Sequence, residues 1–136
     1  MGGMQQPRQG PGMDRTRFID HRGQRLLLLD YTNLGTDADQ LKAEIARTKE
    51  IIGREPHGSV LTLTDVRGSK ITPGNVKAMQ ELVTFNAPYV RWSAVVVGLT
   101  GVYLTGFRAI QVLSRRRNLS AFNDLMEAKE WLVTRP

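Results

Sequence analysis

Cysteine is absent from this chain of 136 residues, and histidine occurs only twice, as His21 and His57. The absence of cysteine excludes disulfides, thiol nucleophiles and thiolate metal ligands. Two histidines leave little scope for a zinc site. No apolar run approaches the ~20 residues that a membrane-spanning helix needs. We therefore expect a cytoplasmic protein that has no membrane span, no metal and no cofactor.

The centre of the chain carries almost no net charge, although the whole chain carries a net charge of +6. Residues 26–113 hold nine basic and eight acidic residues, so the excess lies on residues 1–25 and on the cluster 115–117, which is Arg-Arg-Arg. A nucleic-acid surface usually spreads basic residues over one face and adds aromatic residues for stacking. Only Phe18 lies near the basic N-terminal arm, so we interpret the excess as solvated surface charge and expect no nucleic-acid partner.

Length and composition favour one folded domain that follows a short arm. A chain of 15.3 kDa can bury one core and is too short for two. Residues 1–14 are rich in Gly, Gln, Met and Pro and show no apolar periodicity, which predicts a disordered arm. The chain is 40% hydrophobic and 24% charged, as globular proteins are, so residues 15–136 are expected to form a single domain.

Patterns typical of strands and helices alternate along the chain and predict an α/β fold. Strands are expected at 17–19, 25–31, 59–65, 92–97 and 119–122, and helices from 36, from 73, over 102–113 and from 123 or 124. The run of four leucines within 25–31 is apolar on both faces, as in a central strand covered by helices. The order ββαβαβαβα predicts a mainly parallel sheet of about five strands with helices packed on it, the first strand being antiparallel.

Residues typical of helix caps and buried helix faces support these boundaries. Thr36 with Asp39 fits a capping box, and Thr72-Pro73 places an N-cap before a proline at the first helical position. The apolar faces predicted for three helices are Leu41, Ile45, Thr48 and Ile52; Val76, Met79 and Val83; and Leu125, Ala128 and Leu132. We expect Trp131 to lie beside the last of these faces and to serve packing.

Ligands of parallel α/β sheets bind at the carboxyl ends of the strands, so the polar residues there are candidate site residues. Asp30, Asp65 and Thr100 fall at predicted strand ends, as in a phosphoacceptor receiver domain. The last strand lacks the lysine of such domains, and we interpret Asp65 and Thr100 as capping residues. The chain also has no Gly-x-Ser-x-Gly elbow and no complete phosphate-loop motif. We therefore predict no catalytic residue and no enzymatic activity.

Two stretches of the sequence carry a resemblance to a known superfamily. They are Trp92-Ser93-Ala94-Val95-Val96-Val97-Gly98 and Ala121-Phe122-Asn123-Asp124-Leu125-Met126-Glu127-Ala128-Lys129-Glu130-Trp131-Leu132. Over residues 16–133 the chain resembles the STAS superfamily (sulfate transporter and anti-sigma-factor antagonist), and within it the stand-alone bacterial STAS/SEC14-like, or SpoIIAA-like, domains. The resemblance implies a STAS-like α/β domain that acts as a non-enzymatic regulatory or protein-interaction module in signalling.

The same resemblance points to one loop as a regulatory site. In the anti-sigma antagonists a serine at the start of the helix after the third strand is switched by phosphorylation. Residues 65–72 match that region but lack the family's Asp-Ser pair. The hydroxyls there are those of Ser69 and Thr72, and because Thr72 is expected to cap the helix, Ser69 is the candidate phosphoacceptor. The candidate binding loop and strand-end residues are Asp65, Arg67, Gly68, Ser69, Lys70, Thr72, Gly98 and Thr100.

Two functions follow, and an enzyme ranks below both. The first is a protein-interaction module, whose partner is another protein. The alternative is a domain that binds a small apolar or anionic ligand, such as a lipid or a nucleotide, at the carboxyl ends of the strands. A homo-oligomer is compatible with either. An apolar pocket above roughly 300 Å³ would favour the ligand hypothesis. A flat, partly apolar patch near Ser69 would favour the interaction hypothesis.

Overall fold

The computed structural model describes residues 14–70, 72–97 and 118–136, and it shows an α/β fold with a five-stranded sheet. The strands are β2 (Thr16–His21), β3 (Gln24–Asp30), β4 (Val60–Asp65), β5 (Val90–Val96) and β6 (Leu119–Phe122), and the helices are α1 (Ala38–Ile52), α2 (Pro73–Asn86) and α4 (Leu125–Val133). The strands lie in the order β2-β3-β4-β5-β6, with β2 antiparallel to β3 and the other pairs parallel. The predicted α/β class and mainly parallel sheet are confirmed. The helix predicted over 102–113 and the cluster 115–117 lie outside the described residues.

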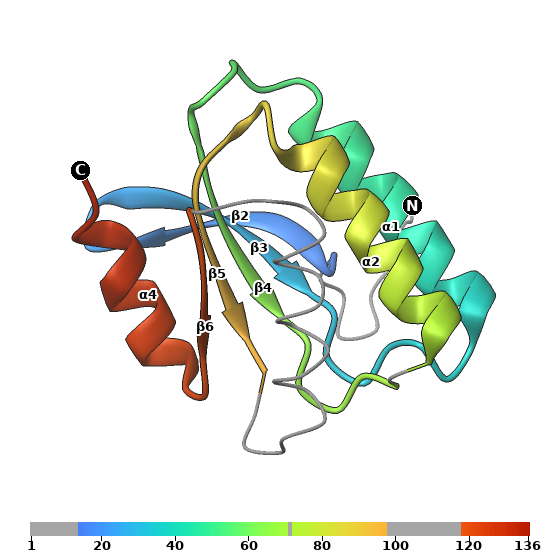
Figure 1. Ribbon diagram of the computed structural model, residues 1–136. Helices are drawn as coiled ribbons and strands as arrows, with labels where there is room; N and C mark the ends of the chain where they lie inside the picture. The colour runs from blue at the N-terminus through green and yellow to red at the C-terminus, as the bar shows by residue number, and fades with distance from the viewer. Residues whose placement is uncertain (1–13, 71, 98–117) are drawn as a thin grey trace, which may run out of the picture.

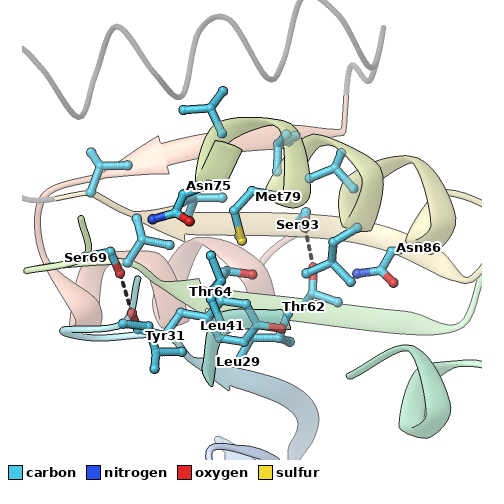
Figure 2. A pocket seen from close by; sticks show the side chains of 18 of the residues that line it. Leu29, Tyr31, Leu41, Thr62, Thr64, Ser69, Asn75, Met79, Asn86 and Ser93 are labelled. Carbon is cyan, nitrogen blue, oxygen red and sulfur yellow. Dashed lines mark hydrogen bonds between the residues drawn. The ribbon is translucent and has the colours of Figure 1, made fainter. Parts of the chain in front are cut away.

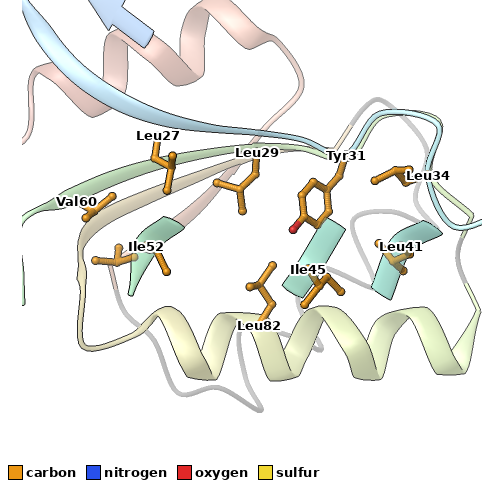
Figure 3. Packing of buried hydrophobic residues seen from close by; sticks show 10 residues of the cluster. Leu27, Leu29, Tyr31, Leu34, Leu41, Ile45, Ile52, Val60 and Leu82 are labelled. Carbon is orange, nitrogen blue, oxygen red and sulfur yellow. The ribbon is translucent and has the colours of Figure 1, made fainter. Parts of the chain in front are cut away.

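Helices cover both faces of the sheet, as Figure 1 shows: α1 and α2 lie side by side on one face, and α4 lies on the other. The leucine run of β3 divides its side chains between these two layers. Leu27 and Leu29 join the core under α1 and α2 (Figure 3), whereas Leu26 packs in the core under α4. The run is apolar on both faces because both faces of β3 are buried. None of the described helices has the length and apolar character that crossing a membrane requires.

The α1 helix begins one residue later than the capping-box pattern predicts. Asp37, not Thr36, is the N-cap, and its carboxylate accepts hydrogen bonds from the backbone N–H of Asp39 at 2.9 Å and of Gln40 at 3.4 Å. The carboxylate adds negative charge where the helix dipole is positive, which a threonine hydroxyl does not. The predicted buried face of this helix, Leu41, Ile45, Thr48 and Ile52, is confirmed.

A buried set of hydroxyl groups joins α1 to β2 and to Tyr31, the residue that follows β3. The Oγ1 atoms of Thr48 and Thr16 lie 2.8 Å apart, and the Tyr31 hydroxyl lies 2.6 Å from Thr48 Oγ1. Thr16 Oγ1 also donates to Glu44 Oε2 at 2.7 Å. Burial raises the pKa of Tyr31 well above its ordinary value, because the phenolate would lose its hydration. Thr48 thus keeps its place on a buried helix face by having partners for its hydroxyl.

The cap predicted for α2 is confirmed, and α4 begins where the sequence predicts the last helix. Thr72 Oγ1 accepts from Asn75 N–H at 3.1 Å, and Pro73 occupies the first turn of α2. Asp124 caps α4 by accepting from Glu127 N–H at 2.9 Å. Strand β6 has the bounds that the sequence predicts. Thr72 and Asp124 suit these positions because helix N-termini present backbone N–H groups that have no partner within the helix.

Candidate functional site

Two loops meet at the carboxyl edge of the sheet and form the surface on which the sequence places its candidate site. The β3–α1 loop and the β4–α2 loop are joined by hydrogen bonds from Asn33 N–H to Arg67 O at 3.0 Å and from Lys70 N–H to Leu34 O at 2.9 Å. Gly68 lies where they touch, at φ 76°, and a Cβ atom there would collide with the side chain of Asn33. The contact therefore requires glycine at this position.

Asp65 is held in an internal ion pair at the end of β4. Its carboxylate accepts hydrogen bonds from Arg67 Nε at 2.9 Å and from Arg67 Nη2 at 2.7 Å. The Asp65 residue is only 5% exposed. Hydrogen bonding to this carboxylate raises the pKa of Arg67 above its ordinary value. The two charges satisfy each other, so the pair shapes the start of the loop and leaves Asp65 engaged within the protein.

The structure places Asp30 beside Asp65 without turning the two into a metal site. The residues are partners across β3 and β4, and Asp30 Oδ1 accepts from Thr32 Oγ1 at 2.6 Å. Thr100 and Gly98, the other strand-end candidates, lie outside the described residues. Within ranges 14–70, 72–97 and 118–136, no group of three or more His, Cys, Asp or Glu side chains is placed to hold a metal ion.

Ser69 points inward from the loop toward the core. Its hydroxyl donates to the carbonyl oxygen of Tyr31, and its side chain lines a cavity beneath α2. The neighbouring Lys70 and Arg67 are exposed. A phosphate on Ser69 would have two cationic side chains nearby, but it would have to break the hydrogen bond to Tyr31.

The cavity lies between the sheet and α2 and has a volume of about 90 Å³ (Figure 2). Its wall on the helix side includes Val76, Met79 and Val83. These are the residues that the sequence predicts as the apolar face of α2, and the structure leaves them half-buried. The fully buried positions of the helix are Leu82 and Asn86. The buried face is therefore rotated from the predicted one, and the three predicted residues line the cavity, where Met79 and Val83 also pack against buried clusters.

Hydroxyl groups from the two central strands form the floor of this cavity. Thr62 and Thr64 on β4 and Ser93 on β5 all line it and are at most 7% exposed. Thr62 and Ser93 are partners across the two strands, and their hydroxyls hydrogen-bond to each other (Figure 2). On the opposite face of the same strands, Leu63 and Ala94 are fully buried in an apolar core. The hydroxyl side chains of these two strands thus all lie on the face that borders the cavity.

One amide oxygen at the cavity has no hydrogen-bond partner. Asn86 lines it and is 5% exposed, and its Oδ1 is the one buried side-chain polar atom without a partner in the part of the chain that the structure describes. The other amide at the cavity differs, since Asn75 Nδ2 donates to Lys70 O at 3.0 Å and to Gly35 O at 3.1 Å. Buried polar groups are normally paired, so the lone oxygen of Asn86 needs an explanation.

Sequence reasoning singled out the loop and missed the cavity floor. Ser69 and Lys70 do border the cavity, but Thr62, Ser93 and Asn86 were not among the candidates. For Thr62 and Ser93 the one signal was a polar residue on one face of a strand whose other residues are mostly apolar. Threonine is also common in ordinary strands, so this signal alone is weak.

The exposed apolar surface does not gather at Ser69. Among the described residues, the large exposed hydrophobic side chains are Phe85, near the end of α2, and Met126 on α4. Comparisons with protein-family models, with curated proteins and with solved structures found no match to this chain. The resemblance to the STAS superfamily therefore stays an expectation from the sequence.

Proposed function

We propose that this chain is a non-enzymatic binding module that takes a small, mainly apolar molecule into the cavity between the sheet and α2. The observation that carries the proposal is the set of hydroxyls from Thr62, Thr64 and Ser93 on a mainly apolar wall. Ligand sites commonly combine an apolar lining with a few placed polar groups, which fix the orientation of the ligand.

Packing of the core does not require these hydroxyl groups. The face of β4 and β5 under α4 is built mainly from leucine, alanine and valine, with Trp92 packed against them. Burying a hydroxyl is costly unless it is hydrogen-bonded, and the Thr62–Ser93 pair uses only one of its two protons. Apolar residues at these positions would stabilise the fold as well or better, so their polarity supports a role in binding.

The volume of the cavity sets the size of the ligand. A space of about 90 Å³ does not reach the ~300 Å³ that would favour a lipid or nucleotide, which is the size at which drug-sized ligands fit. It is also smaller than a lipid chain or a nucleotide requires. We therefore narrow the ligand class from a lipid or nucleotide to a compact molecule of a few non-hydrogen atoms.

A backbone amide NMR titration with 2-methylpropan-1-ol tests this function. We expect saturable shifts confined to residues around the cavity, with weak affinity because so few atoms make contact. Native mass spectrometry of the freshly purified protein serves as a second measurement and would detect a ligand retained from the cell.

A matched pair of variants on α2 locates the binding. Val76→Phe should fill the cavity from its wall and abolish the saturable shifts, whereas Thr84→Phe adds the same ring at an exposed position and should leave them intact. Shifts that never saturate, or that persist unchanged in Val76→Phe, would show that the cavity is not a binding site.

The second candidate function is the STAS-type interaction module regulated at Ser69. It is supported by the position of Ser69 at the carboxyl edge of the sheet, with exposed Arg67 and Lys70 beside it. A phosphate there would gain charge-assisted hydrogen bonds to Lys70, and to Arg67 once its guanidinium leaves Asp65. The loop would then present a different surface to a partner protein.

Phosphosite mapping and partner capture test the second candidate. The protein is purified from its own cells, and pull-downs with Ser69→Ala and Ser69→Asp are compared with wild type. Modified Ser69, together with a partner that distinguishes the two variants, would support the switch. An unmodified Ser69 and identical partners in all three would rule it out.

A further inference from the structure

Asn86 occupies a position on α2 where an apolar residue is expected. It lies three residues beyond Val83 and seven beyond Met79, which is helical spacing on the face toward the sheet. Its backbone carbonyl accepts from Tyr89 N–H at 2.9 Å, so the end of the helix is satisfied without the side chain. The amide is therefore not needed as a cap.

Leaving Asn86 Oδ1 unpaired costs stability in the free protein. An oxygen buried without a partner carries its full desolvation penalty, and a leucine of similar size would avoid it. Figure 2 shows Asn86 toward the end of the pocket opposite Ser69. An acceptor that is unsatisfied and borders a cavity is suited to a donor that arrives with a ligand.

The cavity also offers a donor. Thr62 and Ser93 share one hydrogen bond, and each hydroxyl carries one proton. One of the two protons is therefore left over from the pair. The polar groups bordering the cavity thus comprise an acceptor on α2 and a donor on the sheet.

Resting on the proposed function, we infer that Asn86 Oδ1 accepts a hydrogen bond from an N–H or O–H group of the ligand. Asn86 thereby selects donor-bearing molecules over molecules of the same shape that lack the donor. A small alcohol meets both polar features, because its hydroxyl donates to Asn86 and accepts the remaining proton of the Thr62–Ser93 pair.

Pyrrole and furan test this selection, because they share a ring size and shape and only pyrrole carries an N–H donor. In amide NMR titrations of the wild-type protein, pyrrole should bind roughly three- to tenfold more tightly than furan, which is the worth of one net hydrogen bond. In Asn86→Leu the two affinities should become equal, through a loss of pyrrole affinity.

The outcomes separate the inference from the function on which it rests. If neither ring binds the wild-type protein and 2-methylpropan-1-ol does not bind either, the proposed function fails. If both rings bind equally and Asn86→Leu changes nothing, the cavity is a binding site but Asn86 does not read the ligand, and the inference is overturned.

Thermal unfolding of the ligand-free protein gives a readout that needs no ligand. Asn86→Leu and the smaller Asn86→Val should both melt at or above the wild-type midpoint, since each removes an unpaired acceptor. Because leucine and valine differ in volume, an effect shared by both variants is not caused by the steric fit of one side chain. If both variants melt several degrees lower, Oδ1 already has a partner in the free protein and the inference is overturned.

Discussion

Tyr31 links a single side chain to the pH dependence of the whole fold. Burial raises its pKa above the ordinary value near 10, although its hydrogen bond to Thr48 acts in the opposite direction. Above pH ~10 the unfolded chain loses this proton while the folded protein keeps it, so the free energy of unfolding falls as pH rises toward the folded pKa. Urea unfolding from pH 8 to 11.5 should show a steeper alkaline decline for wild type than for Tyr31→Phe. Parallel declines would mean that Tyr31 ionises as readily in the folded protein.

Gly68 shows how one residue sets the contact between two loops. Gly68→Ala should destabilise the protein for two reasons, namely its φ of 76° and the collision with Asn33. Gly23 is a matched control, since its φ is 79° but a Cβ atom there would meet nothing within 4 Å. We expect about 1 kcal/mol for Gly23→Ala and a further ~1–3 kcal/mol for Gly68→Ala, as measured by chemical denaturation. Equal costs would mean that Asn33 moves aside freely.

At the scale of elements, α4 is fixed to the sheet by a cluster of aromatic rings. Trp131 packs edge-on against Trp92 with ring centres 5.7 Å apart and lies 5.4 Å from Phe122. Trp131 is half-buried, so Trp131→Ala should cost about 2–3 kcal/mol, below the ~3–5 kcal/mol of a fully buried ring. Met126→Ala on the exposed side of α4 should cost less than ~0.5 kcal/mol. Equal urea midpoints for the two variants would contradict this packing role.

At the scale of the whole molecule, the domain is expected to fold without the N-terminal arm. Asp14 is the first residue that the structure describes, and its carboxylate pairs with Arg47 at 2.8 Å. Deleting residues 1–13 keeps that pair, and the midpoint of thermal unfolding should move by no more than a few degrees, which at this size corresponds to ~1 kcal/mol. A larger drop would show that the arm packs on the domain.

Local patterns predicted the elements well where the physical signal was local. Thr72-Pro73 marked the start of α2, because N-caps and first-turn prolines act on their own backbone. The leucine run marked a central strand, because only a doubly covered strand is apolar at consecutive positions. Thr36 was wrong as the cap of α1, since a pattern of residue types could not choose between neighbouring Thr36 and Asp37.

The sequence by itself determined the α/β class, the parallel sheet with its antiparallel first strand, and the loop at the carboxyl edge that contains Ser69. These follow from periodicity and from turn and cap residues, which depend on neighbours along the chain. Only the tertiary structure decided that α2 turns Leu82 and Asn86 inward and leaves a cavity beside Val76 and Val83. That outcome depends on how a helix and a sheet from distant segments fit together. The same fit decides whether the side chains of Thr62, Ser93 and Asn86 find hydrogen-bond partners or border a cavity, because any partners lie on other strands or in another layer.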